Sequence, residues 1–294
     1  LQYEKATGKP LPDHAISWFC SQEIKADDLK FIRDRMSIVQ IYNYMRRQIR
    51  ETRMSGKELL TTWADYLSMA QRFGMDTNDA IIYRVRKLRQ RHDELVARCN
   101  QKELTLRAGE VLKEYPNIER IYESIKEIYG FTAEDYTVIV PSCIEEIMLE
   151  GEHLHHCVGG SERYWERIER KESYVLFLRR TSDLQKSYYT LEIEPDGTVR
   201  QKRTMYDRQE ADIEDAKKFL KKWQKEISRR LTDEERELAK TSRVLREQEF
   251  AQLRENQVII NTGHLRGHLL VDVLMEDLME TKEGATIPAL PAAA

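Results

Sequence analysis

Side chains that can move protons are concentrated in one short stretch of this chain. Three of the seven histidines and one of the four cysteines lie within five positions, from His153 to Cys157. Gly159 and Gly160 follow, and a helical pattern begins at Ser161. Histidine exchanges protons near neutral pH, and the free amides at a helix start attract anions. This stretch therefore predicts a site for chemistry on a phosphate or an ester.

A predicted hairpin supplies further polar side chains. The pair Asp196-Gly197 separates two β-rich segments, residues 187–194 and 198–205, and is typical of a tight turn. A three-residue loop with a bulge would pair Glu192 with Arg200. A two-residue loop would instead place three cross-strand pairs on one sheet face: Glu192 with Gln201, Thr190 with Arg203, and Tyr188 with Met205. Either register brings an acid, a hydroxyl and a basic residue together, as part of a site or as an ordinary solvent-facing ladder.

The periodicity of the remaining chain predicts an α+β fold that positions these groups. Apolar residues spaced by three and four predict a helix over residues 26–54, and a capping box at Ser55 to Glu58 begins another. Strands are expected at residues 136–141 and 174–180 and in the hairpin, with helices between them and from residue 210 onward. We predict a helical N-terminal region followed by a small, mainly antiparallel sheet packed with helices, and a helical C-terminal region.

Four regions are expected along the chain. Residues 1–130 form the helical N-terminal region, and residues 131–228 form the α+β core that holds the candidate site. Residues 229–280 are a charged helical region, and residues 281–294 are predicted to be a disordered tail.

The composition limits the class of protein. The 294 residues carry 34% charged and 40% hydrophobic side chains, and no run of about 18 apolar residues exists that could span a membrane. The chain shows no secretion leader, and its four cysteines lie far apart without a C-x-x-C pair, so we expect free thiols in a reducing cytoplasm. The net charge of −3 argues against a protein that coats nucleic acid with its whole surface, but it allows a local basic groove.

The His-Cys block resembles a known family. The residues that carry the resemblance are Glu150-Gly151, Leu154-His155-His156-Cys157-Val158-Gly159, Tyr164, Phe177-Leu178-Arg179, Tyr189-Thr190-Leu191-Glu192-Ile193 and Gln201. They resemble the PcfJ-like proteins, which occur on conjugative plasmids, phages and other bacterial mobile elements. The similarity covers about residues 30–210. Members often carry a glycine and an asparagine just after the third-strand glutamine, where this chain reads Arg203-Thr-Met-Tyr-Asp207.

The resemblance implies the kind of genetic element on which the protein is encoded, but it implies no particular reaction. It implies a bacterial cytoplasmic protein that works with other proteins of a mobile element, in plasmid conjugation or phage processing. We expect nucleic acid, RNA or DNA, as a further partner, and no membrane. The oligomeric state stays open.

Several chemistries suit the cluster and the hairpin. In metal-independent phosphodiester cleavage of the ribonuclease type, His155 or His156 would move protons, Arg179 and Arg203 would hold the phosphate, and Glu192 would orient a histidine or act as base. The basic residues of the strands predict a basic patch despite the net charge: Arg179, Arg180, Arg200, Lys202 and Arg203. Such a nuclease is the interpretation that we favour.

Other interpretations remain open beside it. His156, Tyr164 and Glu192 are also the residue types of a nucleotide-dependent group transfer of the ADP-ribosyltransferase type. Cys157 beside a histidine is a candidate nucleophile. Zinc is disfavoured because neighbouring residues cannot all converge on one ion, so we expect no metal and no other cofactor. The remaining alternative is a non-catalytic module that binds nucleic acid or scaffolds other proteins.

The predicted site residues fall into two groups. The candidate catalytic residues are His155, His156, Cys157, Tyr164, Arg179, Thr190, Glu192 and Gln201, and the candidate binding residues are Gly159, Gly160, Tyr188, Lys202 and Arg203.

Overall fold

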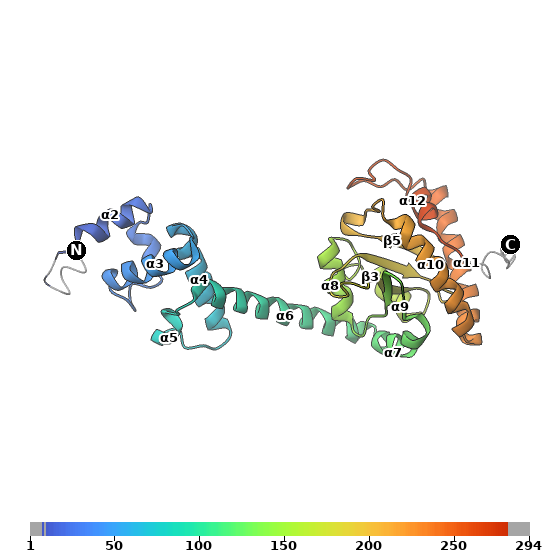
Figure 1. The fold of residues 1–294 in the computed structure, drawn as a ribbon, viewed down its shortest axis with the longest axis horizontal. Coiled ribbons are helices and arrows are strands. Elements are labelled where there is room, and N and C mark those ends of the chain that lie inside the picture. Colours follow the sequence, from blue (N-terminus) through green and yellow to red (C-terminus); the bar gives the residue numbers. More distant parts are fainter. Residues whose placement is uncertain (1–7, 9, 282–294) are drawn as a thin grey trace. The chain divides into compact units, whose positions relative to one another are not determined.

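The protein consists of two compact units that meet inside one long helix. The structure, a computed structural model, describes residue 8 and residues 10–281. The units are Leu1–Glu103 and Leu104–Ala294, and the division falls within helix α6 (Leu88–Glu114; Figure 1). The predicted boundary near residue 130 differs because the end of α6 and helix α7 (Ile118–Tyr129) pack into the core of the second unit. Of the tail predicted over residues 281–294, Thr281 is buried and donates to Asp196, and the rest lies outside the described residues.

The first unit is helical, as predicted, but its helices are shorter than expected. It contains α2 (Asp13–Ser21), the 3-10 helix η1 (Ala26–Leu29), α3 (Ile38–Thr52), α4 (Gly56–Arg72), α5 (Ala80–Tyr83) and the first part of α6. The single helix predicted over residues 26–54 is wrong. The side chains of Ser37 and Gln40 form a capping box that starts α3 afresh, because such side chains satisfy the free amides of a new helix end. The predicted start at Ser55 is confirmed, since its hydroxyl accepts the Glu58 amide.

The second unit is built on a five-stranded antiparallel sheet whose strands follow the chain order. The strands are β1 (Phe131–Ala133), β2 (Tyr136–Ile139), β3 (Tyr174–Arg180), β4 (Tyr189–Ile193) and β5 (Val199–Arg203). The helices after α7 are α8 (Ile144–Leu154), α9 (Glu162–Glu169), α10 (Ile213–Arg230), α11 (Asp233–Glu255) and α12 (Leu270–Asp277), and the 3-10 helix η2 (Met205–Asp207) follows β5. The α+β class is confirmed. The short strand β1 was not predicted.

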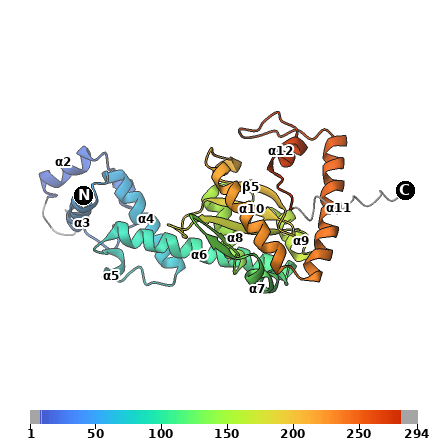
Figure 2. The ribbon, with the colours of Figure 1, turned by 45° about the vertical axis from the view of Figure 1, so that its right-hand side comes forward.

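The two faces of the sheet are covered by different helices. Figure 1 shows α8 and α9 beside β3, and they cover the face that includes Val175, Thr190 and Glu192. Helix α10 covers the other face, where the Phe219 ring lies 5.4 Å from the ring of Tyr136. In Figure 2, α11 and α12 lie side by side, and α12 contacts β5.

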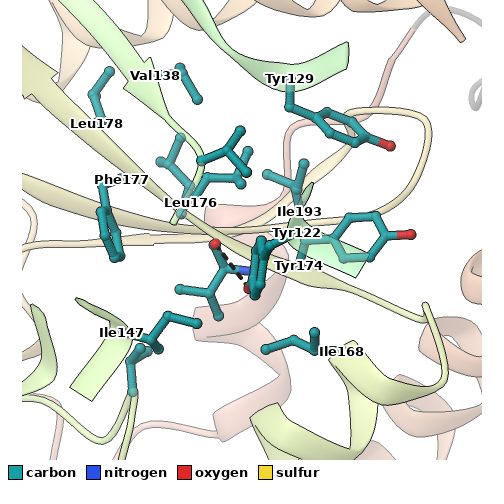
Figure 3. Close-up of a cluster of buried hydrophobic side chains, with 14 of the residues drawn as sticks. Tyr122, Tyr129, Val138, Ile147, Ile168, Tyr174, Leu176, Phe177, Leu178 and Ile193 are labelled. Atoms are coloured by element: carbon teal, nitrogen blue, oxygen red, sulfur yellow. Dashed lines mark hydrogen bonds between the residues drawn. The ribbon is translucent and has the colours of Figure 1, made fainter. Parts of the chain in front are cut away.

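Buried aromatic and aliphatic side chains hold these layers together. Figure 3 shows part of this core, in which Tyr122, Tyr174 and Leu176 are almost fully buried. The Tyr122 hydroxyl donates to the carbonyl of Val175 and accepts its amide, both at 3.1 Å. Each buried side chain of this size stabilises the fold by roughly 1.5–3 kcal/mol relative to an exposed position. No helix within the described ranges is long and apolar enough to cross a membrane.

The hairpin has the predicted pairing beyond its tip and a different loop. Glu192 lies opposite Gln201, and Thr190 lies opposite Arg203, as the two-residue loop predicts. Nearer the turn, Ile193 pairs with Val199, so the register shifts by one residue. Near the turn the register is therefore that of the three-residue loop. A bulge between Glu192 and Ile193 then restores the register of the two-residue loop for the rest of the hairpin.

Candidate functional site

The loop that carries the histidines is held against α8 by two glycines. α8 ends at His155, whose backbone is left-handed (φ 52°), and the His156 amide donates to the Gly151 carbonyl at 3.1 Å. A Cβ on Gly151 would lie 1.8 Å from the carbonyl oxygen of Val158, and a Cβ on Gly159 would lie 2.6 Å from the Cα of Met148. Only glycine permits this approach of two backbones. The spacing of Gly151 and Gly159 therefore fixes the path of the loop.

The predicted anion site at the start of α9 is surrounded by acidic side chains. The N-cap of α9 is Ser161, and its side chain makes no capping hydrogen bond. A hollow of about 360 Å³ beside Gly159 and Gly160 is lined by Arg107 and by three carboxylates: Glu110, Glu114 and Glu162. Three carboxylates repel an anion, so this lining disfavours the phosphate role predicted for Gly159 and Gly160.

A buried ion pair joins α8 to the sheet. Glu150 is 1% exposed, and Arg179 donates to its two carboxylate oxygens at 2.8 and 2.5 Å. The hydroxyls of Ser187 and Thr190 donate to the same carboxylate at 2.7 and 3.2 Å. The charge of Arg179 is thus neutralised by Glu150 of α8. The guanidinium binds this carboxylate and does not line the cavity beside His156.

His156 lies between this ion pair and a small polar cavity. Its Nε2 is 2.9 Å from the Thr190 hydroxyl oxygen, and its Nδ1 is buried without a hydrogen-bond partner in the described part of the chain. Burial lowers the pKa of His156 below 6.5, against the opposing influence of Asp207 and Glu150. The imidazole is therefore neutral at neutral pH.

The tautomer of His156 follows from its neighbours. The Glu150 carboxylate can only accept, so the Thr190 proton is directed to Glu150. The Thr190 oxygen then accepts the proton of His156 Nε2. Nδ1 is left with a free lone pair, which makes it the basic nitrogen of the ring.

The cavity brings together most of the predicted catalytic residues. Its volume is about 20 Å³, room for about one water molecule. The lining consists of His156, Val158, Tyr164, Val175, Thr190, Glu192, Gln201, Arg203 and Asp207. Burial raises the pKa of Tyr164 well above 10, so its hydroxyl keeps its proton.

Glu192 is the fixed charge of the cavity. It is 3% exposed and accepts from Arg167 at 2.8 Å, Ser173 at 2.7 Å and Gln201 at 3.0 Å. Burial by itself would raise the pKa of Glu192, but the guanidiniums of Arg167 and Arg200 outweigh it and lower this pKa. Glu192 is ionised and oriented by three donors.

Two predicted residues of the His-Cys block lie apart from the cavity or lack the predicted chemistry. His155 stacks on the exposed ring of Tyr206, with 4.9 Å between ring centroids, and does not line the cavity. The Cys157 sulfur lies 3.8 Å from the Tyr164 hydroxyl. Cys157 is exposed, but the groups packed around its sulfur desolvate the thiol in part and raise its pKa, which disfavours the thiolate that a nucleophile requires.

Two predicted binding residues also point elsewhere. Tyr188 precedes β4, so the alternation of the strand does not extend to it, and its hydroxyl donates to Asp212 at 2.6 Å. Lys202 is fully buried and forms an ion pair with Asp277 of α12.

The basic patch predicted on the strands is wrong. Each of its cations has a carboxylate partner from another element. The pairs are Arg179 with Glu150, Arg180 with Asp212, Arg200 with Glu172 and Glu194, and both Lys202 and Arg203 with Asp277. Apart from the contact of Arg200 with Glu194, these pairs join distant parts of the chain, so the strand sequence alone contains no sign of them.

Three residues at the site were missed by sequence reasoning. Glu150 belongs to the block on which the resemblance rests, but it had no assigned role. Arg167 bonds Glu192 and Glu249, which are 25 and 82 residues away, so no local pattern marks it. Asp207 follows Tyr206, and both have a positive φ, 58° and 57°, a conformation that glycine and asparagine adopt more easily.

Among the described residues, no three His, Cys, Asp or Glu side chains are placed to hold a metal ion.

Comparison with known proteins identifies relatives of this chain. The model of the family described as PcfJ-like protein matches residues 62–220. An uncharacterised protein of Listeria innocua is 41% identical over 71 residues, which are 24% of this chain and 15% of the Listeria protein. The chain thus aligns with a small part of that relative's length. No solved structure matches.

Proposed function

The chain belongs to the PcfJ-like family, and we propose that the cavity beside His156 is an active site that cleaves phosphodiester bonds of nucleic acid without a metal. The observation that carries this proposal is the state of His156. Its Nδ1 is buried, unpartnered and, by the Glu150–Thr190 relay, unprotonated. A neutral histidine with one free nitrogen is suited to remove a proton from a hydroxyl.

The other cavity residues have roles that follow from their charge states. A hydroxyl of the substrate, most simply the 2′-hydroxyl of RNA, transfers its proton to His156 Nδ1 as its oxygen forms a bond to phosphorus. The bond from phosphorus to the leaving oxygen breaks, and Tyr164, which is protonated at neutral pH, transfers its proton to that oxygen. The proton taken up by His156 then returns to the Tyr164 oxygen through water, so both groups regain their starting states. Gln201, which Glu192 holds in place, contacts the phosphate oxygens, and Arg203, the cation of the cavity lining, does so at the expense of its ion pair with Asp277. This is the ribonuclease-type mechanism.

Substrate entry requires a movement of η2. Asp207 of this segment lines the cavity, which is too small for a nucleotide. Tyr206 and Asp207 have left-handed backbones, and such conformations of non-glycine residues require support from their surroundings. The support at Tyr206 is the stack on His155. Displacement of this segment would open the cavity toward solvent.

The test compares two neighbouring histidines in the intact chain. His156→Ala should reduce cleavage of a labelled RNA by about 100-fold or more, the usual contribution of a general base. His155→Ala is the matched control: it removes the ring that supports Tyr206 but no proton-transfer group of the cavity, so it should retain the single-turnover rate of cleavage at saturating RNA. Chelation of divalent metal should leave the rate unchanged, and the acid limb of the rate profile should lie below pH 6.5, because burial lowers the pKa of His156. Full activity of folded His156→Ala would refute the assignment.

A second candidate, the non-catalytic scaffold, is favoured by one specific observation. Both buried carboxylates beside the cavity, Glu150 and Glu192, have their oxygens engaged by donors of this chain. A scaffold role would make His156 a packing residue, so His156→Ala would unfold the second unit and RNA would stay intact. The ADP-ribosyltransferase alternative needs Glu192 free to contact a ribose, and three donors oppose this. Release of nicotinamide from NAD tests that alternative directly.

A further inference from the structure

The first unit contains an open cavity of about 710 Å³ with a strongly cationic lining. We call it the cationic pocket and define it by its charged and amide side chains: Arg47, Arg84, Arg86, Lys87, Gln90 and Arg91. None of the carboxylates in the described part of the chain lines it. The pocket lies wholly within the first unit and, apart from Arg47, within the stretch that matches the family.

The core of the first unit holds the backbone of the pocket in place. The segment between α5 and α6 presents its carbonyls inward, where Tyr44 donates to Val85 at 2.9 Å and Trp63 donates to Tyr83 at 2.9 Å. Gln48, which is fully buried, donates to the Arg86 carbonyl at 2.6 Å. With its carbonyls anchored in this way, the segment exposes its basic side chains to solvent. The pocket is therefore a built feature of the fold.

The cations of the pocket are largely unneutralised. Arg84, Arg86 and Lys87 are exposed, and none forms an ion pair with a described residue. The Arg47 guanidinium lies over the Tyr44 ring, 5.8 Å from its centroid, and its Nε is buried without a hydrogen-bond partner in the described chain. Arg91 pairs with Glu94 at 2.7 Å. This arrangement contrasts with the sheet of the second unit, where each strand cation named above has a carboxylate partner.

We infer that the cationic pocket binds the phosphate backbone of nucleic acid without regard to base sequence. Several unpaired cations on a rigid backbone attract a polyanion and release its counterions. No aromatic ring lines the pocket, so it offers no platform on which a base can stack. A free nucleotide would therefore bind weakly, whereas a chain of phosphates can contact several cations at once. This inference does not rest on the proposed cleavage at His156.

The experiment measures the binding of labelled oligonucleotides to the full chain by fluorescence anisotropy. The test variant is Arg84→Gln with Arg86→Gln and Lys87→Gln, three exposed residues whose loss leaves no partner unpaired. The matched control makes the same charge change on α10, at Lys218, Lys221 and Lys225. Single-stranded RNA, single-stranded DNA and duplex DNA of equal length show which backbone is preferred.

The inference predicts specific outcomes. The test variant should bind at least about tenfold more weakly, and the slope of log affinity against log salt should fall by about 2–3, as expected for three lost phosphate contacts. The α10 variant should bind as the unmodified protein does. Arg84→Lys with Arg86→Lys keeps the charges and should retain affinity within a few-fold.

Other outcomes would overturn the inference. Unchanged affinity of the triple glutamine variant would exclude the pocket as the binding site. Competition by poly-glutamate as strong as by RNA of equal charge would indicate an acidic protein partner, and competition by ATP at equal phosphate concentration would indicate a free nucleotide. His156→Ala should bind RNA normally while it loses cleavage, so a failure of the cleavage proposal remains distinguishable from a failure of this one.

Discussion

Removal of one partner of the Glu150–Arg179 ion pair should destabilise the second unit strongly. Glu150 is 1% exposed and accepts hydrogen bonds from Arg179, Ser187 and Thr190. An uncompensated charge in such a place costs about 3–5 kcal/mol. For a unit of this size, each kcal/mol lowers the melting temperature by about 2–4 °C, so Arg179→Met should lower it by about 12 °C.

A double-mutant cycle separates the ion pair from general damage to the core. Glu150→Ala combined with Arg179→Met removes both charges, so the double variant should be less destabilised than the sum of the single variants by at least about 1.5 kcal/mol. Arg107 of α6 and Glu152 of α8 provide the control, because they form an exposed pair at 2.9 Å that also joins α8 to another element. Arg107→Met should change stability by less than about 1 kcal/mol.

Urea unfolding followed by circular dichroism gives the free energies for this cycle. The reasoning would be refuted if Arg179→Met cost no more than Arg107→Met, or if the two single effects simply added. Either result would mean that Arg179 does not neutralise Glu150 in solution, and it would restore Arg179 as a candidate phosphate ligand.

Three further predictions concern backbone contact and pH. Gly151→Ala should destabilise the protein by at least about 3 kcal/mol in urea unfolding, because its Cβ would meet a backbone oxygen at 1.8 Å. Gly109→Ala in α6, where a Cβ meets nothing within 4 Å, should be neutral or stabilising by up to about 1 kcal/mol. Burial lowers the pKa of Lys202 to about 8, so the unfolded state binds more protons between this value and 10.5. Stability should therefore rise with pH above 8, by at most about 1.4 kcal/mol per unit, and Lys202→Met should flatten that rise. Burial also lowers the pKa of His156, so stability should fall as pH drops below 6.5, and less so in His156→Gln.

Local patterns predicted the strands better than the helices of the first unit. The strand Tyr174–Arg180 has its predicted bounds, since a run of β-rich residues between polar turns has few alternatives. The helix predicted over residues 26–54 followed a real apolar spacing, but that spacing continued across a break at Ser37. Periodicity reports which residues are buried, and a cap decides where the helix begins.

The side chains of the site were predictable where the alternation of a strand determines which sheet face they occupy. Thr190, Glu192 and Gln201 were predicted on one face, and they do line the cavity with His156. The charges of the site were not predictable, because most strand cations have partners far along the chain, such as Glu150 for Arg179 and Asp277 for Arg203. Lys202 shows this clearly, since Asp277 lies 75 residues further along the chain. The charge of Lys202 suggested a phosphate ligand, whereas the burial of its side chain makes it a structural residue.

The net charge of the chain conceals opposite charges in the two units. Residues 1–103 contain 19 lysines and arginines and 14 aspartates and glutamates, whereas residues 104–294 contain 29 and 37. The first unit is therefore positive by five charges, and the second is negative by eight.

This division agrees with the two proposals above, which place binding in the first unit and chemistry in the second. A site in the acidic second unit would gain little substrate from its own field, because its cations already have partners. Unpaired cations in the first unit provide the attraction that such a site lacks. On this reasoning, loss of the cationic pocket should raise the KM for nucleic acid and leave kcat nearly unchanged, whereas loss of His156 should lower kcat and leave binding intact.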